Sequence, residues 1–208
     1  MAISEKGKRI LAGFCEENTR KIVNADACDI QDQQANAIVH DCKQLFIKHH
    51  IDPYRDDKGT GLIRHVLVKT AAATGEILVV LVTAAEVFPG RNNFVTDLRA
   101  AHPEITSIVQ NVNSRITPVV LGDLERVVYG KGYIEDVLMG KRFRIGAKTF
   151  FQVNPKQTEV ALPKGDRIRQ AEGDRRRHRR LFRRRNDRDH PLRLWSRRCT
   201  ASNSIRHP

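Results

Sequence analysis

The stretch Ile77–Val82 reads ILVVLV and is the longest uninterrupted apolar run in the chain. A strand with one solvated face alternates apolar and polar residues, so a run without alternation predicts a strand covered on both faces. The β-branched run Leu62–Lys69 precedes it, and Ala71–Gly75 between them ends in a glycine. With Glu76–Thr83 as the second strand, this pattern predicts a β-hairpin with a glycine-containing turn.

Downstream of this hairpin the pattern changes to that of a helix and then returns to that of a strand. Asn93–Ala101 is predicted as a short helix that ends before Pro103, and Ile105–Val112 is predicted as the next strand. The order strand, helix, strand is typical of α/β and α+β layers. We therefore expect an α/β fold class.

Upstream, the sequence predicts a hairpin and one long helix. Arg9–Glu16 and Arg20–Val23 are short, partly apolar runs on either side of a polar turn. The helix is predicted after Asp29, as its N-cap, and is expected to end near His50. Its apolar face has helical spacing and comprises Ala35, Ile38, Val39, Cys42, Leu45 and Phe46.

The region after the predicted central strands contains short extended pieces. Glycines punctuate Val127–Ile145, and Phe150–Asn154 is expected to be the last extended piece. Pro155 suits the first turn of a following helix.

The positive charge is concentrated at one end of the chain. The 208 residues include 37 Lys and Arg against 24 Asp and Glu, for a net charge of +13. Residues 161–208 contain 16 of those basic residues and 5 of the acidic ones, and 15 of the 16 are arginine. The net charge alone would indicate a nucleic-acid partner. Because most of the net positive charge lies in residues 161–208, we infer instead that the composition of the chain changes near residue 160.

Cysteine usage and hydropathy predict the cellular setting. The four cysteines are scattered without a C-x-x-C pair, which favours a reducing cytoplasm over a disulfide framework. No apolar run approaches the roughly 20 residues that a membrane span requires. We expect a cytoplasmic monomer with no membrane association.

Six segments carry a resemblance to a known family. The most specific is Phe150–Glu159, which reads FFQVNPKQTE, and the others are Ala27–Gln31, Gly61–His65, Ile108–Asn113, Gly130–Asp136 and Phe143–Ile145. In order and spacing they resemble the S-adenosylmethionine-dependent RNA uracil-C5 methyltransferases, which modify 23S rRNA and tRNA. The resemblance covers residues 7–160.

The resemblance implies a domain organisation and a cofactor contact. It implies a mixed α+β central domain over residues 1–148 and the start of a Rossmann-like methyltransferase domain over residues 149–160. Gln152 would contact S-adenosylmethionine, because a side-chain amide offers both donors and an acceptor to an amino-acid group. The structural alternative is that Gln152 satisfies backbone groups at a strand end. RNA is the implied partner, with 23S rRNA favoured over tRNA.

Metal and acid–base candidates are weaker. Cys28 matches an iron–sulfur ligand of cluster-bearing relatives, but the other three cysteines of that set are missing here, so we expect an orphan ligand, no cluster and no metal site. His49, His50 and His65 have no ligand at metal spacing and are not assigned a catalytic role. Five basic residues could contact phosphate or simply be solvated: Arg64, Lys69, Arg142, Arg144 and Lys148.

Residues 161–208 depart from the family. The family continues into a glycine-rich cofactor loop of the type V-I-D-A-Y-C-G-x-G-T, whereas this chain continues into arginine blocks. Synonymous codons chosen for Arg177–Asp189 and read one base later encode V-I-D-A-Y-S-G-V-G-T-I-G. We therefore predict that one inserted base near the codons of Val160 and Ala161 shifted the reading frame, and that 161–208 form a disordered, off-frame tail.

The predicted frameshift has a functional consequence. The family mechanism uses a cysteine thiolate that attacks C6 of uracil, methyl transfer to C5, and a base that removes the C5 proton. The nucleophile and the base would lie beyond the matching segments, so no catalytic residue is assigned, and Cys199 does not replace the nucleophile. We expect an inactive methyltransferase fragment. The alternative is a non-enzymatic RNA-binding protein that uses the Arg-rich tail.

Overall fold

The computed structural model describes residues 1–161 except 7, 8, 18, 20, 26, 56, 57, 116–118 and 153. The chain divides into two compact units, Met1–Pro155 and Lys156–Pro208. Residues 155–161 are helical, as expected after the asparagine–proline step, and they include the described part of the second unit. The predicted disordered tail lies outside the described residues, apart from Ala161.

The first unit is built on a seven-stranded sheet with the strand order β3-β2-β1-β4-β5-β6-β7. The strands are β1 Ala2–Lys6, β2 Arg9–Cys15, β3 Ile22–Asn24, β4 Ile63–Thr70, β5 Ile77–Thr83, β6 Ile105–Val112 and β7 Leu124–Tyr129. Strands β5 and β6 are parallel, and the other neighbours are antiparallel. A separate hairpin pairs β8 (Tyr133–Leu138) with β9 (Lys141–Gly146).

Two helices belong to this unit: α1 (Gln33–Lys48) and α2 (Arg91–Ala101), which connects the parallel strands β5 and β6. The N-cap of α1 is Asp32, whose Oδ1 accepts a hydrogen bond from the backbone N–H of Gln34 at 2.8 Å. The prediction of Asp29 as the N-cap was therefore wrong. A capping side chain must reach an N–H of the first turn, and Asp29 lies three residues too early.

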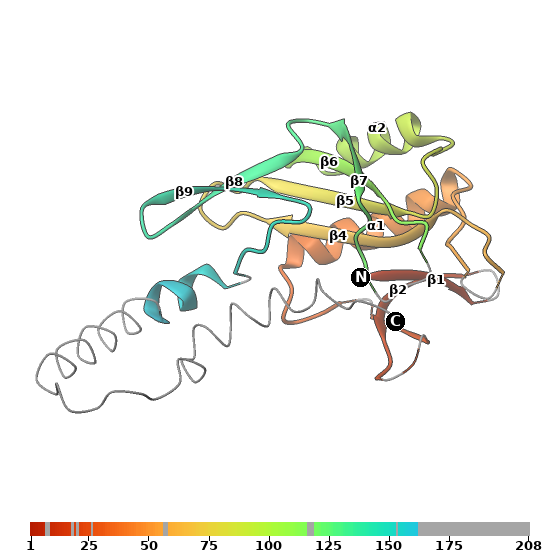
Figure 1. Cartoon of the computed structure of the whole chain (residues 1–208), viewed down its shortest axis with the longest axis horizontal. Coiled ribbons are helices and arrows are strands. Elements are labelled where there is room, and N and C mark those ends of the chain that lie inside the picture. The colour runs from red at the N-terminus through yellow and green to blue at the C-terminus, as the bar shows by residue number, and fades with distance from the viewer. Residues whose placement is uncertain are drawn as a thin grey trace, which may run out of the picture. The chain divides into compact units, whose positions relative to one another are not determined.

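Strand β5 separates two hydrophobic cores, and all seven of its residues are buried. Ile77, Val79 and Leu81 pack in one core with residues of α1 and α2. Leu78 and Val80 pack in the other core with residues of the β8–β9 hairpin. Figure 1 shows the helices and this hairpin together with the central strands. The prediction of a strand covered on both faces is confirmed, because helices cover one face and the hairpin covers the other.

Most of the elements predicted from sequence are present. The two hairpins, both helices and the strand after α2 are confirmed, and the fold is mixed α/β. Strand β1 was not predicted, and the segment Phe150–Asn154 is not a strand at its described positions. Within the described part of the chain, no helix combines the length and apolar character needed to span a bilayer.

One motif glycine has a clear structural reason. Gly130 follows β7 with a φ of +74°, a left-handed conformation that side chains disfavour. A Cβ there would lie 2.1 Å from the carbonyl oxygen of Thr106. The turn from β7 to β8 therefore requires glycine, and this turn brings the hairpin back over the sheet.

Candidate functional site

The chain leaves β9 through a tight turn that precedes Gln152. The backbone N–H of Gly146 donates to Oγ1 of Thr149 at 3.1 Å, and the N–H of Thr149 donates to the Gly146 carbonyl at 3.3 Å. Ala147, inside the turn, is buried in the core beneath the hairpin. Two hydrogen bonds within the turn and the burial of Ala147 therefore fix its conformation and its place on the core. The turn thereby determines the starting position of the segment Phe150–Gln152.

Lys69, near the end of β4, donates two hydrogen bonds to this turn. Its Nζ donates to the carbonyl of Gly146 at 2.8 Å and to that of Thr149 at 2.7 Å. Burial lowers the pKa of Lys69, and the charge of Glu125 acts weakly in the opposite direction. A cation in this position neutralises the partial negative charge of two carbonyls that converge on one point.

A cavity of about 360 Å³ lies beside the turn. This volume falls within the usual range for small-molecule pockets, which is about 300–1,000 Å³. Its apolar lining comes from Met1, Ala35, Val39, Val68, Ile145, Phe150 and Phe151, and its polar lining from Gln31, Asp32, Lys69, Thr70, Thr149 and Gln152. A mostly apolar cavity with a few convergent polar groups can hold a ligand that has both apolar and polar parts.

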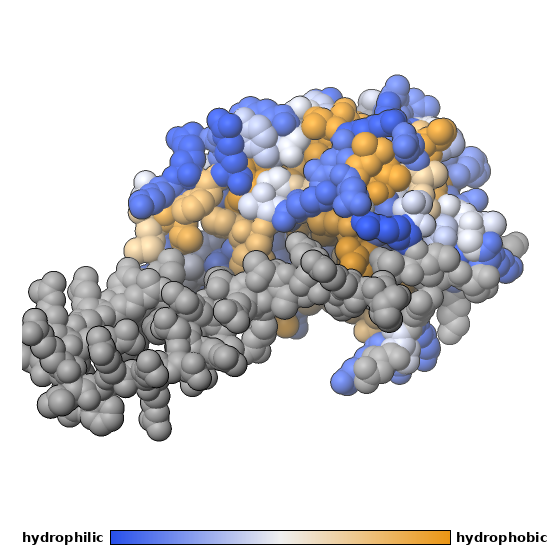
Figure 2. Space-filling view, in the orientation of Figure 1, coloured by the Kyte–Doolittle hydropathy of each residue, from blue (hydrophilic) through white to orange (hydrophobic). Residues whose placement is uncertain are grey.

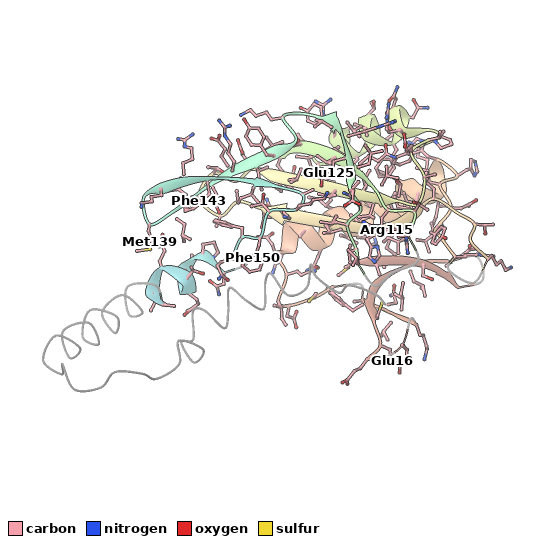
Figure 3. The ribbon with its side chains drawn as sticks, in the orientation of Figure 1. Glu16, Arg115, Glu125, Met139, Phe143 and Phe150 are labelled. Carbon is pink, nitrogen blue, oxygen red and sulfur yellow. The ribbon has the colours of Figure 1, made fainter. Side chains whose placement is uncertain are left out.

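The cavity joins two of the motif segments identified in the sequence. Gln31, from the segment before α1, and Gln152, from the segment after β9, both line it. The structure thus places two glutamines that are 121 residues apart in sequence in the wall of one cavity. Phe150, which begins the second segment, is 63% exposed, whereas Phe151 contacts Phe143 with their ring centroids 5.9 Å apart. Figure 3 shows Phe143 on the hairpin and Phe150 on the segment that leaves it.

A second polar cluster holds the loop between β6 and β7. Asn111 exchanges two hydrogen bonds with the backbone of Gly122, at 2.7 and 3.1 Å. Asn113 donates to the carbonyls of Val119 and Val120 and accepts from the N–H of Arg115. Both asparagines are buried and belong to the motif Ile108–Asn113. Their side-chain amides hold the backbone of the loop between β6 and β7 through hydrogen bonds. The sequence alone did not predict this structural role.

Gln110 of the same motif faces the other direction. Its Nε2 donates to Oγ1 of Thr83 and to the carbonyls of Ala85 and Glu86. The residue is fully buried, so it fixes the start of the loop that leads to α2. The motif therefore supports two neighbouring loops at the carboxyl ends of the parallel strands.

The basic residues considered for phosphate contact are engaged within the protein. Arg64 is buried and donates to the carbonyls of Asn113 and Arg115, at 2.8 and 2.6 Å. Arg142 and Arg144 both bind the carboxylate of Glu135, and these hydrogen bonds, led by that from Arg142, lower the pKa of Glu135.

Lys148 donates to the carbonyl of Asp123. Arg64 and Lys69 are thus structural residues, and the arginine pair is the most exposed of this set. Figure 2 shows hydrophilic and apolar surface side by side in the region of the hairpin.

The cysteine and histidine candidates do not form a metal site in the described residues. Cys28 is half-buried, and its carbonyl oxygen accepts from Nδ2 of Asn36 at 3.0 Å. Cys42 is buried in the helix-side core, and burial raises the pKa of its thiol. His49 contacts Asp97 at 2.8 Å. No group of three or more potential metal ligands is present in the part of the chain that the structure describes.

Much of the chain is similar in sequence to RNA methyltransferases. No model of a protein family matches the sequence. An uncharacterized RNA methyltransferase of Bacillus cereus (strain ATCC 14579) is 36% identical over 162 residues, which cover 78% of this chain and 35% of the relative. A relative of the same description from Listeria monocytogenes (serovar 1/2a) is 39% identical over 152 residues, covering 73% of this chain and 33% of the relative.

A solved structure has the same fold over most of the chain. The crystal structure of Pyrococcus abyssi tRNA (uracil-54, C5)-methyltransferase in complex with S-adenosyl-L-homocysteine matches with a TM-score of 0.65 and 24% identity. The match covers 81% of this chain and 40% of that protein. This chain spans about a third of the length of the curated relatives that it matches. Over about three quarters of its length the chain is therefore a homologue of bacterial RNA methyltransferases, and it carries part of the fold of a uracil-C5 methyltransferase.

Proposed function

We propose that this chain is part of an S-adenosylmethionine-dependent RNA (uracil-C5)-methyltransferase whose substrate is 23S rRNA. The observation that carries the proposal is the position of Gln152, the motif residue expected to contact the cofactor, in the wall of a cavity of about 360 Å³. Gln31 lines the same cavity. Side-chain amides offer donors and an acceptor to the carboxylate and amino ends of an amino-acid ligand, whereas the apolar wall fits its less polar parts.

The residues of this chain have binding and orienting roles in the proposal. S-adenosylmethionine supplies the methyl group when it is bound, and the Gln152 amide would hold its amino-acid part. The nucleophile and the base are assigned to the part of the relatives that this chain does not match. We therefore expect the chain alone to be inactive. An iron–sulfur cluster does not fit the described residues, because they contain no group of three or more potential ligands, whereas such a cluster is normally held by four cysteines.

The test begins with the nucleotide sequence from codon 150 onward. We expect that deleting one base near the codons of Val160 and Ala161 restores a reading frame that encodes the cofactor loop. The restored protein should form 5-methyluridine in 23S rRNA, as measured by mass spectrometry of digested nucleosides. The chain of 208 residues should form none.

Methyl transfer by the 208-residue chain would overturn its assignment as an inactive fragment. Methyl transfer by the restored protein to tRNA transcripts alone would overturn the proposed substrate, and the absence of methyl transfer to both RNAs would overturn the proposed activity. In the restored protein, Gln152→Ala should raise the KM for S-adenosylmethionine about tenfold, which corresponds to about 1.4 kcal/mol of lost binding. Gln44→Ala, which removes the same side chain at an exposed position of α1 outside the cavity wall, is the matched control.

A second candidate is a non-enzymatic RNA-binding protein. The observation that favours it is the concentration of 16 of the 37 basic residues in 161–208. Arginine clusters bind phosphate without regard to sequence, and their affinity falls steeply with salt. A defined RNA site that disappears when 161–208 are deleted would favour this candidate over the enzyme fragment.

A further inference from the structure

The turn Gly146–Thr149 sets where the chain begins its approach to Gln152. The turn Gly146–Thr149 is closed by the hydroxyl of Thr149 and by one backbone hydrogen bond of 3.3 Å. The next three residues, up to Gln152, belong to no strand. Any group that fixes both ends of this turn therefore also fixes the starting point and direction of the Gln152 segment.

Lys69 contacts both ends of the turn. Its two hydrogen bonds, at 2.8 and 2.7 Å, reach the first and the last carbonyl of the turn, 77 and 80 residues away in sequence. Lys69 itself is held in the sheet, where it pairs with Leu78 of the fully buried strand β5. The ammonium group thus links β4, which is held in the sheet by its pairing with β5, to a segment outside the sheet.

We propose that Lys69 is a positioning residue that orients the segment Phe150–Gln152 and so places the Gln152 amide at the cavity wall. The functional meaning of this placement rests on the proposed cofactor role of Gln152. Lys69 also lines the same cavity. An ammonium group has three donors, and two of them are directed to the turn.

Substitutions at position 69 and at Lys148 separate the role of the Lys69 ammonium group from that of its apolar stem and from that of a nearby positive charge. A methionine at position 69 would keep most of the apolar stem but would leave two converging carbonyls without their donor. An arginine would keep the charge and could donate to both carbonyls. Lys148 lies in the turn itself but donates to the carbonyl of Asp123, outside the turn, so its removal should not affect the Gln152 segment.

The test measures local order by 15N relaxation in the full chain. In the unmodified protein we expect backbone order parameters above about 0.8 for Phe150–Gln152. K69M should lower them below about 0.6, while those of β5 stay unchanged. K69R and K148M should leave both sets unchanged. If K69M does not fold, K69Q, which keeps one polar donor group, should give an intermediate loss at the same residues.

Several results would overturn the proposal. One is a set of low order parameters for Phe150–Gln152 in the unmodified protein, and another is no change of these order parameters in K69M. A third is an equal decrease of these order parameters in K148M. An equal decrease in β5 of K69M would indicate a general structural role for Lys69. None of these measurements uses the cofactor. A titration of the frame-restored protein with S-adenosylhomocysteine that fails to shift the side-chain amide of Gln152 would contradict its cofactor role and leave the positioning role of Lys69 intact.

Discussion

The two faces of the central sheet are covered in different ways. On the helix side, 18 buried residues of the described chain form one core, which includes the stacked rings of Phe46 and Phe94 with centroids 5.1 Å apart. On the hairpin side, the core has eight buried residues, two of them alanines. Because apolar burial scales with area, the helix side contributes most of the hydrophobic stabilisation.

The hairpin side compensates with directional polar contacts. The buried carboxylate of Asp136 accepts from the backbone N–H groups of Ala72 and Ala73, at 3.1 and 2.9 Å. The N–H of Glu135 donates to the carboxylate of Glu76 at 2.7 Å. These bonds join β8 to the turn between β4 and β5. Such bonds have fixed directions. The candidate cavity is bounded by both sides, because Val39 and Val68 of its wall pack with the helix-side core and Ile145 packs in the hairpin-side core.

The largest effect is expected from a substitution that creates a cavity in the helix-side core. Phe94→Ala should lower the free energy of unfolding by about 3–5 kcal/mol, because a fully buried ring is lost between Phe46 and Phe88. Urea denaturation followed by circular dichroism measures the loss. Phe143→Ala, on the hairpin and 40% exposed, is the control and should cost much less. Equal losses would mean that the two faces contribute alike.

The next effect comes from the buried carboxylate of the hairpin. Asp136→Ala removes the acceptor of three backbone N–H groups, those of Ala72, Ala73 and Val137. We expect a loss of about 2–3 kcal/mol, since hydrogen bonds to charged groups are strong and unpaired buried donors are costly.

Hydrogen exchange should be faster in β8 and β9 of this variant than in α1. Asp136→Asn keeps the shape and one oxygen acceptor, so its effect should be smaller. Uniformly faster exchange throughout the unit would contradict a local role for this carboxylate.

The sequence predicts the helix side better than the hairpin side for a physical reason. Helical spacing and the unbroken run Ile77–Val82 are local signals, and they correctly indicated α1, α2 and the doubly covered β5. Asp136 and Lys69 act on groups 63 to 80 residues away, and no local pattern reports such contacts. Strand β1 and its place between β2 and β4 also depend on distant pairing.

The candidate site was predicted in part. The motif Phe150–Glu159 indicated Gln152, and the structure places this residue in a cavity wall. Lys69 was considered as a phosphate contact or a solvated charge, and its hydrogen bonds to the turn Gly146–Thr149 were not predicted.

The smallest expected effect concerns the charged contacts at the rim of the helix side. Hydrogen bonds from Lys48 and His49, at 2.6 and 2.8 Å, lower the pKa of Asp97 and so join α1 to α2. A carboxyl group whose pKa is lower in the folded state stabilises the fold above its unfolded value of about 3.9. That contribution is lost as the pH falls below about 4 and through the folded value.

Urea midpoints measured from pH 7 to pH 2 should therefore fall less steeply below pH 4 in Asp97→Asn than in the unmodified protein. The difference between the two proteins should be present at neutral pH and should shrink in acid, because protonation removes from the unmodified protein the same charge that the substitution removes. Exposed pairs contribute little, so this effect should rank below those of Phe94 and Asp136. Parallel pH profiles for the two proteins would show that packing alone joins the helices.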